Sequence, residues 1–204
     1  FHLLTNAPVS IRDLAIRNAS TSGFGAAIHH TGAGAVTLSN LVVTDNVAGG
    51  FGGAINNNSS GAISIQTSTI SRNTTQGSSF GGGINNNWTG SISIADSVVS
   101  ENTAGGWGGG VNNNWTGTIG ITGSELSDNT ATGWGGGINN NDDGTVTIAL
   151  ATITGNSAEN GGGINNNDGG TVTVTSSSIS ANTATGTLGD SNRRPAGSAS
   201  RSAR

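Results

Sequence analysis

Apolar residues recur along the chain in a pattern that repeats every 26 to 29 residues. The most regular position follows a run of glycines and precedes up to three asparagines, as in residues 81–87. A fixed period of this length indicates a solenoid, since a β-propeller blade takes about 40 to 45 residues. The apolar anchors at this position are Ile28, Ile55, Ile84, Val111, Ile138 and Ile164.

Two further apolar columns lie between one anchor and the next. The first of these columns is a pair of apolar residues that flank a small or polar one, as in Ile92 and Ile94. The second is a single apolar residue five positions after the pair, as in Val99. Alternation with a period of two is typical of a strand with one buried face, and no segment has a helical period. The sequence therefore predicts an all-β parallel β-helix, a solenoid with three short strands per coil and about 27 residues per coil.

Asparagines also return at fixed places, at one corner of each coil and in the triplet that follows the anchor. Asparagine tolerates a left-handed backbone, and amides stacked about 4.8 Å apart can bond to one another, as in cross-β structure. We expect structural ladders, with ligand binding as the alternative, and we expect the first and third asparagine of each triplet to point outward. The ladder residues are Asn46, Asn73, Asn102, Asn129, Asn156 and Asn182 at the corner, and Asn57, Asn86, Asn113, Asn140 and Asn166 in the triplet.

The repeats divide the chain into one solenoid and a tail. The solenoid is expected at residues 1–185, with a partial first coil at 1–23 and six coils at 24–185. Residues 186–204 break every column and contain four arginines among glycine, serine and alanine, so this tail is expected to be disordered. Neither end of the repeat region carries the cap that a solenoid normally needs, so we expect the rod to be part of a longer chain.

The composition of the chain argues against several classes of function. The chain has 36 glycines, 9% charged residues and no cysteine, which excludes a disulfide framework and a thiolate metal site. All seven basic residues are arginine and four of them lie in the tail, so nucleic-acid binding through a basic face is not expected. The chain has no run of 18 apolar residues and no phosphate loop, so we expect no membrane-spanning helix and no cofactor.

Aromatic residues form two groups within the repeat, one before the glycine run and one after the asparagine triplet. Rings one coil apart can stack and close a corner of the solenoid, which is the structural interpretation. The alternative is a platform for sugar rings, with Trp88, Trp115, Trp107 and Trp134 as candidate glycan-binding residues. The first group is Phe24, Phe51, Phe80, Trp107 and Trp134, and the second is Trp88 and Trp115.

Hydroxyl side chains alternate with buried isoleucine and valine in the middle strand, so they are expected to form a grid on the surface. Such grids resemble the ice-binding faces of β-solenoid antifreeze proteins. Gly120 interrupts the grid, Ala35 and Ala62 occupy equivalent positions, and threonine is in any case a favourable strand residue. The candidate ice-binding residues are Ser91, Ser93, Thr118, Thr145, Thr147, Thr171 and Thr173.

Acidic residues provide the remaining candidate chemistry. Asp142 and Asp168 are in register, with Asp143 beside the first, and paired carboxylates could bind Ca²⁺ or cleave glycosides. Ca²⁺ takes about six to eight oxygen ligands, however, and a solvated turn offers little desolvation to create a general acid. These three residues are the only candidates for a metal site, and we expect neither a bound metal nor catalysis.

Two smaller features have structural explanations. Arg72 lies between Asp45 and Glu101 in a column of corner residues, which indicates an exposed charge ladder. His29 and His30 occupy positions that hold asparagine in later coils. They are therefore interpreted as substituted asparagine positions rather than as catalytic residues.

The repeat units resemble those of a family of bacterial surface proteins. Residues 52–55 read Gly-Gly-Ala-Ile and residues 81–84 read Gly-Gly-Gly-Ile, and the opening segment at 9–18 is similar to a first coil of that family. The resemblance is to right-handed parallel β-helix proteins, in particular polymorphic outer-membrane proteins and autotransporter passengers. It covers residues 5–185 and implies a right-handed coil and an extracellular or outer-membrane location.

The resemblance implies a non-catalytic rod that serves as an adhesin, passenger or structural spacer. Surface glycans or host cell-surface molecules are the partners that it suggests. Because the same architecture also serves polysaccharide lyases and hydrolases, a polysaccharide-binding or polysaccharide-cleaving β-helix is one alternative. An ice-binding solenoid is the other. The rod has no lysine, and no arginine lies near Asp142 in the repeat, so the base that a lyase would need is missing.

Overall fold

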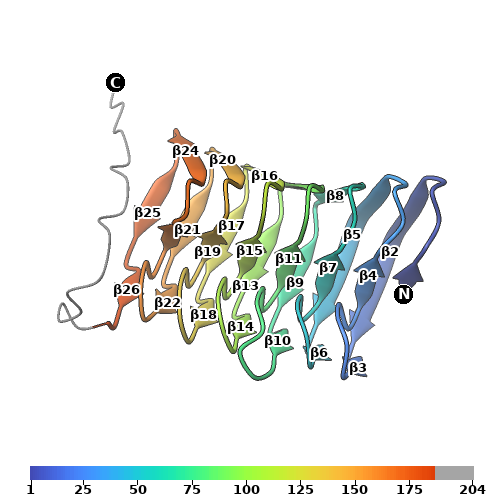
Figure 1. Ribbon diagram of the computed structural model, residues 1–204, viewed down its shortest axis with the longest axis horizontal. Coiled ribbons are helices and arrows are strands. Elements are labelled where there is room, and N and C mark those ends of the chain that lie inside the picture. The colour runs from blue at the N-terminus through green and yellow to red at the C-terminus, as the bar shows by residue number, and fades with distance from the viewer. Residues whose placement is uncertain (187–204) are drawn as a thin grey trace.

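The computed structural model describes residues 1–186 as a rod of seven stacked coils (Figure 1). The strands pair in parallel with equivalent strands of neighbouring coils, and the described residues contain no helix. Paired residues are separated by one repeat, as for Ile84, which pairs with Ile55 on one side and with Val111 on the other. The predicted all-β parallel solenoid is confirmed.

Three sheets run along the rod. The first contains β1 (His2–Leu3), β4 (Ile28–His30), β7 (Ile55–Asn57), β11 (Ile84–Asn86), β15 (Val111–Asn113), β19 (Ile138–Asn140) and β23 (Ile164–Asn166). The second contains β2 (Val9–Arg17), β5 (Val36–Thr44), β8 (Ala62–Gln66), β9 (Thr69–Ser71), β12 (Ser91–Ala95), β13 (Val98–Ser100), β16 (Thr118–Thr122), β17 (Glu125–Ser127), β20 (Thr145–Ala149), β21 (Thr152–Thr154), β24 (Thr171–Thr175) and β25 (Ser178–Ser180). The third contains β3 (Ser20–Thr21), β6 (Val47–Ala48), β10 (Thr74–Thr75), β14 (Thr103–Ala104), β18 (Thr130–Ala131), β22 (Ser157–Ala158) and β26 (Thr183–Ala184).

From the third coil onward each coil has four strands, where the sequence predicted three. Two of the four belong to the second sheet and meet at a bend, where Thr67 and Asp96 have positive φ angles of 47° and 49°. The additional strand is the one in the third sheet. It is only two residues long and contains threonine and alanine, as in β14, so no large apolar residue marks its position in the sequence.

The first coil is more complete than expected. Its strands β1, β2 and β3 pair in register with β4, β5 and β6 of the second coil. The six coils predicted after residue 23 follow. The tail predicted at 186–204 lies outside the described residues, apart from Gly186.

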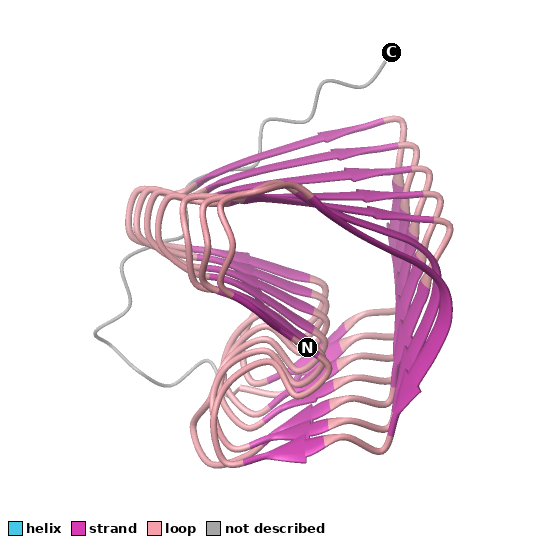
Figure 2. Cartoon of the chain, turned by 90° about the vertical axis from the view of Figure 1, so that its right-hand side faces the viewer, coloured by secondary structure: helices cyan, strands magenta, loops and turns pink. Residues whose placement is uncertain are grey.

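A narrow apolar core runs along the rod, and Figure 2 shows the strands of successive coils superimposed around it. The three apolar columns expected from the sequence fill this core. In the fourth coil, for example, Ile84, Ile92, Ile94 and Val99 are at most 2% exposed. Under the third sheet the inward residues are small, and they form a separate cluster of Ala104, Ala131 and Ala158.

Glycines before each anchor let the backbones of neighbouring coils approach closely. Gly108 has a φ angle of +66°, a left-handed conformation that other residues rarely adopt. A β-carbon added to Gly109 would lie 2.4 Å from the carbonyl oxygen of Gly136 in the next coil. The recurrent glycine run is therefore required by the backbone path and by the contact between coils.

The corner asparagines form an unbroken ladder from Asn46 to Asn182, as predicted. Each Nδ2 donates to the Oδ1 of the next coil at 2.8 to 3.0 Å. The same Oδ1 also accepts the backbone N–H of the donating asparagine, at 2.9 to 3.1 Å. The ladder residues from Asn46 to Asn156 expose no surface, so these bonds are made out of contact with water.

The middle asparagines of the triplets form a second ladder, here called the inner ladder, from Asn57 to Asn166. Each Nδ2 donates to the Oδ1 of the next coil at 2.8 to 3.0 Å. It also donates to the carbonyl oxygen of a glycine four residues later, as Asn113 does to Gly117 at 2.8 Å. The inner ladder thus joins neighbouring coils and fixes the turn after each strand of the first sheet.

We predict that Asn113→Ala lowers the free energy of unfolding by about 2 to 5 kcal/mol, because it removes three hydrogen bonds and leaves the buried Asn140 Oδ1 without a donor. Asn86 Nδ2, the Gly117 carbonyl and Asn140 Oδ1 would each lose a bond of 2.8 to 2.9 Å. The control is Asn114→Ala, at a half-buried position with longer bonds of 3.2 Å. Urea titration followed by circular dichroism measures both, and equal losses would contradict the prediction.

Candidate functional site

The outer face of the first sheet carries two more asparagine ladders, which the sequence did not predict. The first and third asparagine of each triplet face away from the core, as expected, but they bond to their equivalents instead of being free. Each Nδ2 donates to the Oδ1 of the preceding coil, at 2.8 to 2.9 Å in one ladder and at 2.5 to 3.2 Å in the other. These outer ladders are Asn56, Asn85, Asn112, Asn139 and Asn165, and Asn58, Asn87, Asn114, Asn141 and Asn167.

Burial separates the two outer ladders. The residues from Asn56 to Asn139 are at most 1% exposed, whereas Asn58 and Asn87 are half-buried. The signal for both ladders was present in the sequence, because asparagine occupies all three triplet positions in five successive coils. An outward position that is identical in every coil can pair with itself along the rod.

The aromatic column before the glycine runs forms a continuous stack of rings. From Phe51 through Phe80 and Trp107 to Trp134 the ring centroids are 4.5 to 4.9 Å apart and the planes differ by 3° to 9°. Phe24 joins the stack at 5.5 Å with a tilt of 37°. Trp107 has a ring on each side, so its two faces are occupied by neighbours, and Trp134 has one such neighbour.

Trp88 and Trp115 form a separate pair at the turn after the triplet. Their rings stack at 5.5 Å and 11°, and each side chain is 51% exposed. Trp88 Nε1 donates to Asn58 Oδ1 of the preceding coil at 2.7 Å. The residue equivalent to Trp88 in that coil is Ser59, which is too small to cover the other face of the indole. One face of Trp88 therefore remains open.

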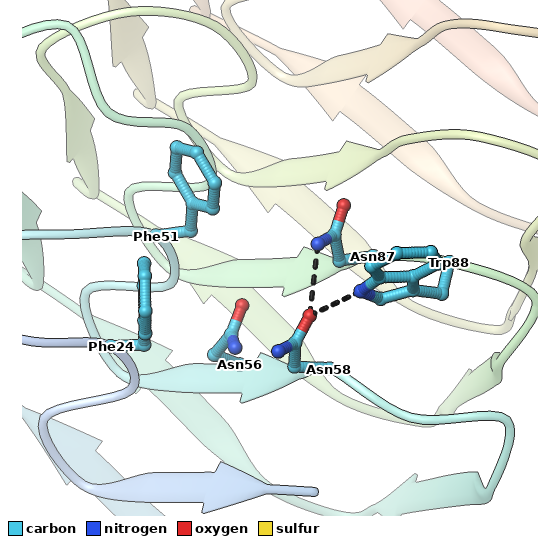
Figure 3. A pocket seen from close by; sticks show the side chains of 6 residues that line it. All are labelled: Phe24, Phe51, Asn56, Asn58, Asn87 and Trp88. Atoms are coloured by element: carbon cyan, nitrogen blue, oxygen red, sulfur yellow. Dashed lines mark hydrogen bonds between the residues drawn. The ribbon is translucent and has the colours of Figure 1, made fainter.

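A pocket of about 180 Å³ lies beside this open face, between the two aromatic groups (Figure 3). Phe24 and Phe51 lie on one side of it and Trp88 on the other, with three asparagine side chains between them. Its lining residues are Phe24, Phe51, Asn56, Asn58, Asn87 and Trp88. Of the candidate glycan-binding residues, only Trp88 lines this pocket.

The hydroxyl grid lies on the outer face of the second sheet. Ser91, Thr118, Thr145 and Thr171 pair in one row along the rod, and a second row contains Ser93, Thr147 and Thr173. All seven side chains are exposed or half-exposed. Gly120 interrupts the second row, as expected.

The candidate acids lie in the same turns as Trp88 and Trp115, further along the rod. Asp142 and Asp168 each accept a hydrogen bond from the preceding asparagine, at 2.7 and 2.9 Å. Asp143 donates its backbone N–H to the carbonyl oxygen of Asp168. Within residues 1–186 no group of three or more acidic or histidine side chains is gathered in a way that could hold a metal ion.

The charge column at the corner contains one ion pair among the described residues. Arg72 donates from Nε to Asp45 Oδ1 at 2.9 Å and from a terminal nitrogen to Oδ2 at 3.1 Å. Hydrogen bonding from Arg72 is the main cause that lowers the pKa of the Asp45 carboxyl group, and the hydrogen bond from Thr44 lowers it further. Both side chains are exposed, so the pair is expected to add little to stability.

Two histidines occupy the N-terminal ends of asparagine columns, as the sequence interpretation proposed. In the strand register His29 pairs with Asn56 and His30 with Asn57. His30 Nδ1 lies 3.1 Å from Asn57 Oδ1, and the His30 side chain is 1% exposed. Burial lowers the pKa of both histidines, and the neighbouring His2 and His30 lower that of His29 further.

Family models, curated proteins and solved structures give no match to this chain. Within the described residues no helix is long and apolar enough to cross a membrane.

We predict that His30→Asn reduces the loss of stability at acidic pH. Because the folded protein lowers the pKa of His30, its neutral form stabilises the fold above the unfolded pKa of about 6.5, and this contribution disappears as the pH falls below that value. An asparagine would continue the inner ladder and carries no titrating group. Melting temperatures at pH 7.5 and 5 test this. The melting temperature of the variant should fall less between these two pH values than that of the wild type, and an equal fall in both would contradict the prediction. Some pH dependence should remain in the variant, because the pKa of His29 is lowered as well.

Proposed function

We propose that this chain is a non-catalytic rod of a bacterial surface protein, in which a right-handed β-helix serves as an adhesin, a passenger or a structural spacer. The observation that carries the proposal is the continuity of the asparagine ladders. Four ladders cross successive coil boundaries, and each uses one side chain per coil to bind the neighbouring coil.

An arrangement of this kind suits a structural rod. In a solenoid each coil contacts only its neighbours, so stability is the sum of similar contacts between coils. Bonds between identical residues can be repeated over any number of coils, which gives a rod of adjustable length. The surface location is supported by the resemblance of the Gly-Gly-Ala-Ile repeats to those of bacterial surface proteins.

We predict that an antibody against this chain labels intact, non-permeabilised cells of the source bacterium. An extracellular rod is accessible without permeabilisation, and brief protease treatment of intact cells should remove the label. A cytoplasmic protein in the same cells provides the control and should not be labelled. Labelling of the chain only after permeabilisation would contradict the proposal.

One observation favours the ice-binding alternative. The two hydroxyl rows lie in register on a parallel sheet, and the last three coils contribute most of the threonines, including Thr145, Thr147 and Thr171. Strands about 4.8 Å apart give such rows a regular spacing along the rod. Thermal hysteresis that is present in the wild type and lost in Thr147→Tyr would favour this function over the rod proposal.

The polysaccharide-cleaving alternative depends on Asp142 and Asp168. Release of new sugar ends from pectin or alginate by the wild type, lost in Asp142→Asn or Asp168→Asn, would show that the rod is an enzyme. Both acids lie in exposed turns and accept bonds from neighbouring amides. We propose that they serve the turns and have no catalytic role.

A further inference from the structure

We propose that the pocket between Phe51 and Trp88 binds one sugar residue that carries an acetamido group, with the acetamido carbonyl as the acceptor for asparagine amides. This binding site is independent of the proposed rod function. The proposal is based on three features: the direction of the hydrogen bonds in the outer ladders, the N–H donors that these ladders leave without an acceptor, and the aromatic walls of the pocket.

The outer ladders end in open donors at this pocket. Trp88 Nε1 and Asn87 Nδ2 both donate to Asn58 Oδ1, at 2.7 and 2.9 Å. Because an indole N–H can only donate, it fixes which end of the Asn58 amide is the oxygen. Asn58 Nδ2 therefore faces the other way, and no group in residues 1–186 accepts a hydrogen bond from it.

Asn56 presents a second open donor. Its Oδ1 accepts from Asn85 Nδ2 at 2.8 Å, and its Nδ2 makes no hydrogen bond with the described residues. This nitrogen is not one of the buried atoms that lack a partner, so it reaches the solvent in the pocket. The two ladders end here because the second coil has His29 and Thr31 at the equivalent positions. An amide N–H that faces the pocket and has no acceptor in the protein can donate to a ligand oxygen placed there.

The ladders strengthen these two donors. Within each outer ladder five amides are aligned in the same sense, with every Nδ2 donating toward the N-terminal end of the rod. Hydrogen bonds in such a chain polarise one another, which increases the partial positive charge on the terminal N–H groups. The pocket lies at the end of the rod's two outer ladders where the terminal N–H groups are free to donate.

The side-chain oxygens of the pocket already take part in hydrogen bonds, whereas two of its N–H donors do not. Asn58 Oδ1 accepts two bonds, and the oxygens of Asn56 and Asn87 each accept one from the following coil, the last from Asn114 Nδ2 at 3.2 Å. A hydroxyl group needs an acceptor as well as a donor, whereas a carbonyl needs donors alone. No charged side chain lines the pocket, so a carboxylate would lose its hydration without a countercharge. A neutral carbonyl is the group that fits.

The walls of the pocket match the remaining parts of an acetamido sugar. The open face of Trp88 can stack against the C–H face of a sugar ring, and Phe24 and Phe51 can contact the acetamido methyl group (Figure 3). The pocket offers about 180 Å³ of space, and the proposed site takes one sugar residue there, with the rest of a glycan outside.

The test is the binding of N,N′-diacetylchitobiose and of cellobiose to the full chain, measured by calorimetry and by chemical shifts of the Trp88 indole. We expect the acetylated disaccharide to bind and cellobiose to bind at least about tenfold more weakly. Equal binding of both sugars, or no binding of either at millimolar concentration, would overturn the proposal.

Three variants test the roles of the pocket residues. Asn58→Asp keeps an acceptor for Trp88 Nε1 and removes the open donor, so it should lower the affinity about tenfold or more. Trp88→Ala should have a similar effect because it removes the stacking surface. Trp115→Ala is the matched control, because this exposed ring lies behind Trp88 and outside the pocket. Equal effects of Trp88→Ala and Trp115→Ala would contradict the assigned site, as would full affinity in a folded Asn58→Asp variant.

Discussion

The hydrogen bond between equivalent asparagine amides of successive coils is the interaction on which the rest of this structure depends. A carboxamide carries a donor and an acceptor, so one residue type can bind to copies of itself above and below. An aspartate could only accept. The histidine at the end of the inner ladder, His30, meets Asn57 Oδ1 with Nδ1, and its Nε2 is buried without a partner, so the ladder does not continue beyond it. With strands about 4.8 Å apart, the amide bonds of the ladder form at 2.8 to 3.0 Å without distortion of the sheet.

The ladders also account for the other repeated residues. Because each amide must meet its equivalent, the coils have to stay in register, and the glycine runs allow the backbones to approach closely enough. Aromatic rings before the glycines stack with the same spacing, at 4.5 to 4.9 Å over most of the column. The corner and inner ladders donate toward the C-terminal end of the rod, and the outer ladders donate toward the N-terminal end. This opposite direction places the open donors of Asn56 and Asn58 in the third coil.

Much of the fold could be predicted from the sequence, since the features that define it repeat. The anchors, the alternation around Ile92 and Ile94 and the corner asparagines all gave correct positions for buried residues. The strand of the third sheet was missed because a Thr-Ala pair has no large apolar side chain. The open donor of Asn58 could not be predicted either. Its direction is set by Trp88 of the next coil, and this contact appears only once the coils are stacked.

The most direct test of the ladders is the hydrogen exchange of individual asparagine side-chain amides, measured by nuclear magnetic resonance. Asn102 and Asn129 are fully buried members of the corner ladder, and Asn18 is an exposed asparagine of the first coil. If the ladders hold the coils together, the Nδ2 protons of Asn102 and Asn129 should exchange at least about a hundredfold more slowly than those of Asn18. Similar exchange rates at all three residues in the folded protein would contradict the account.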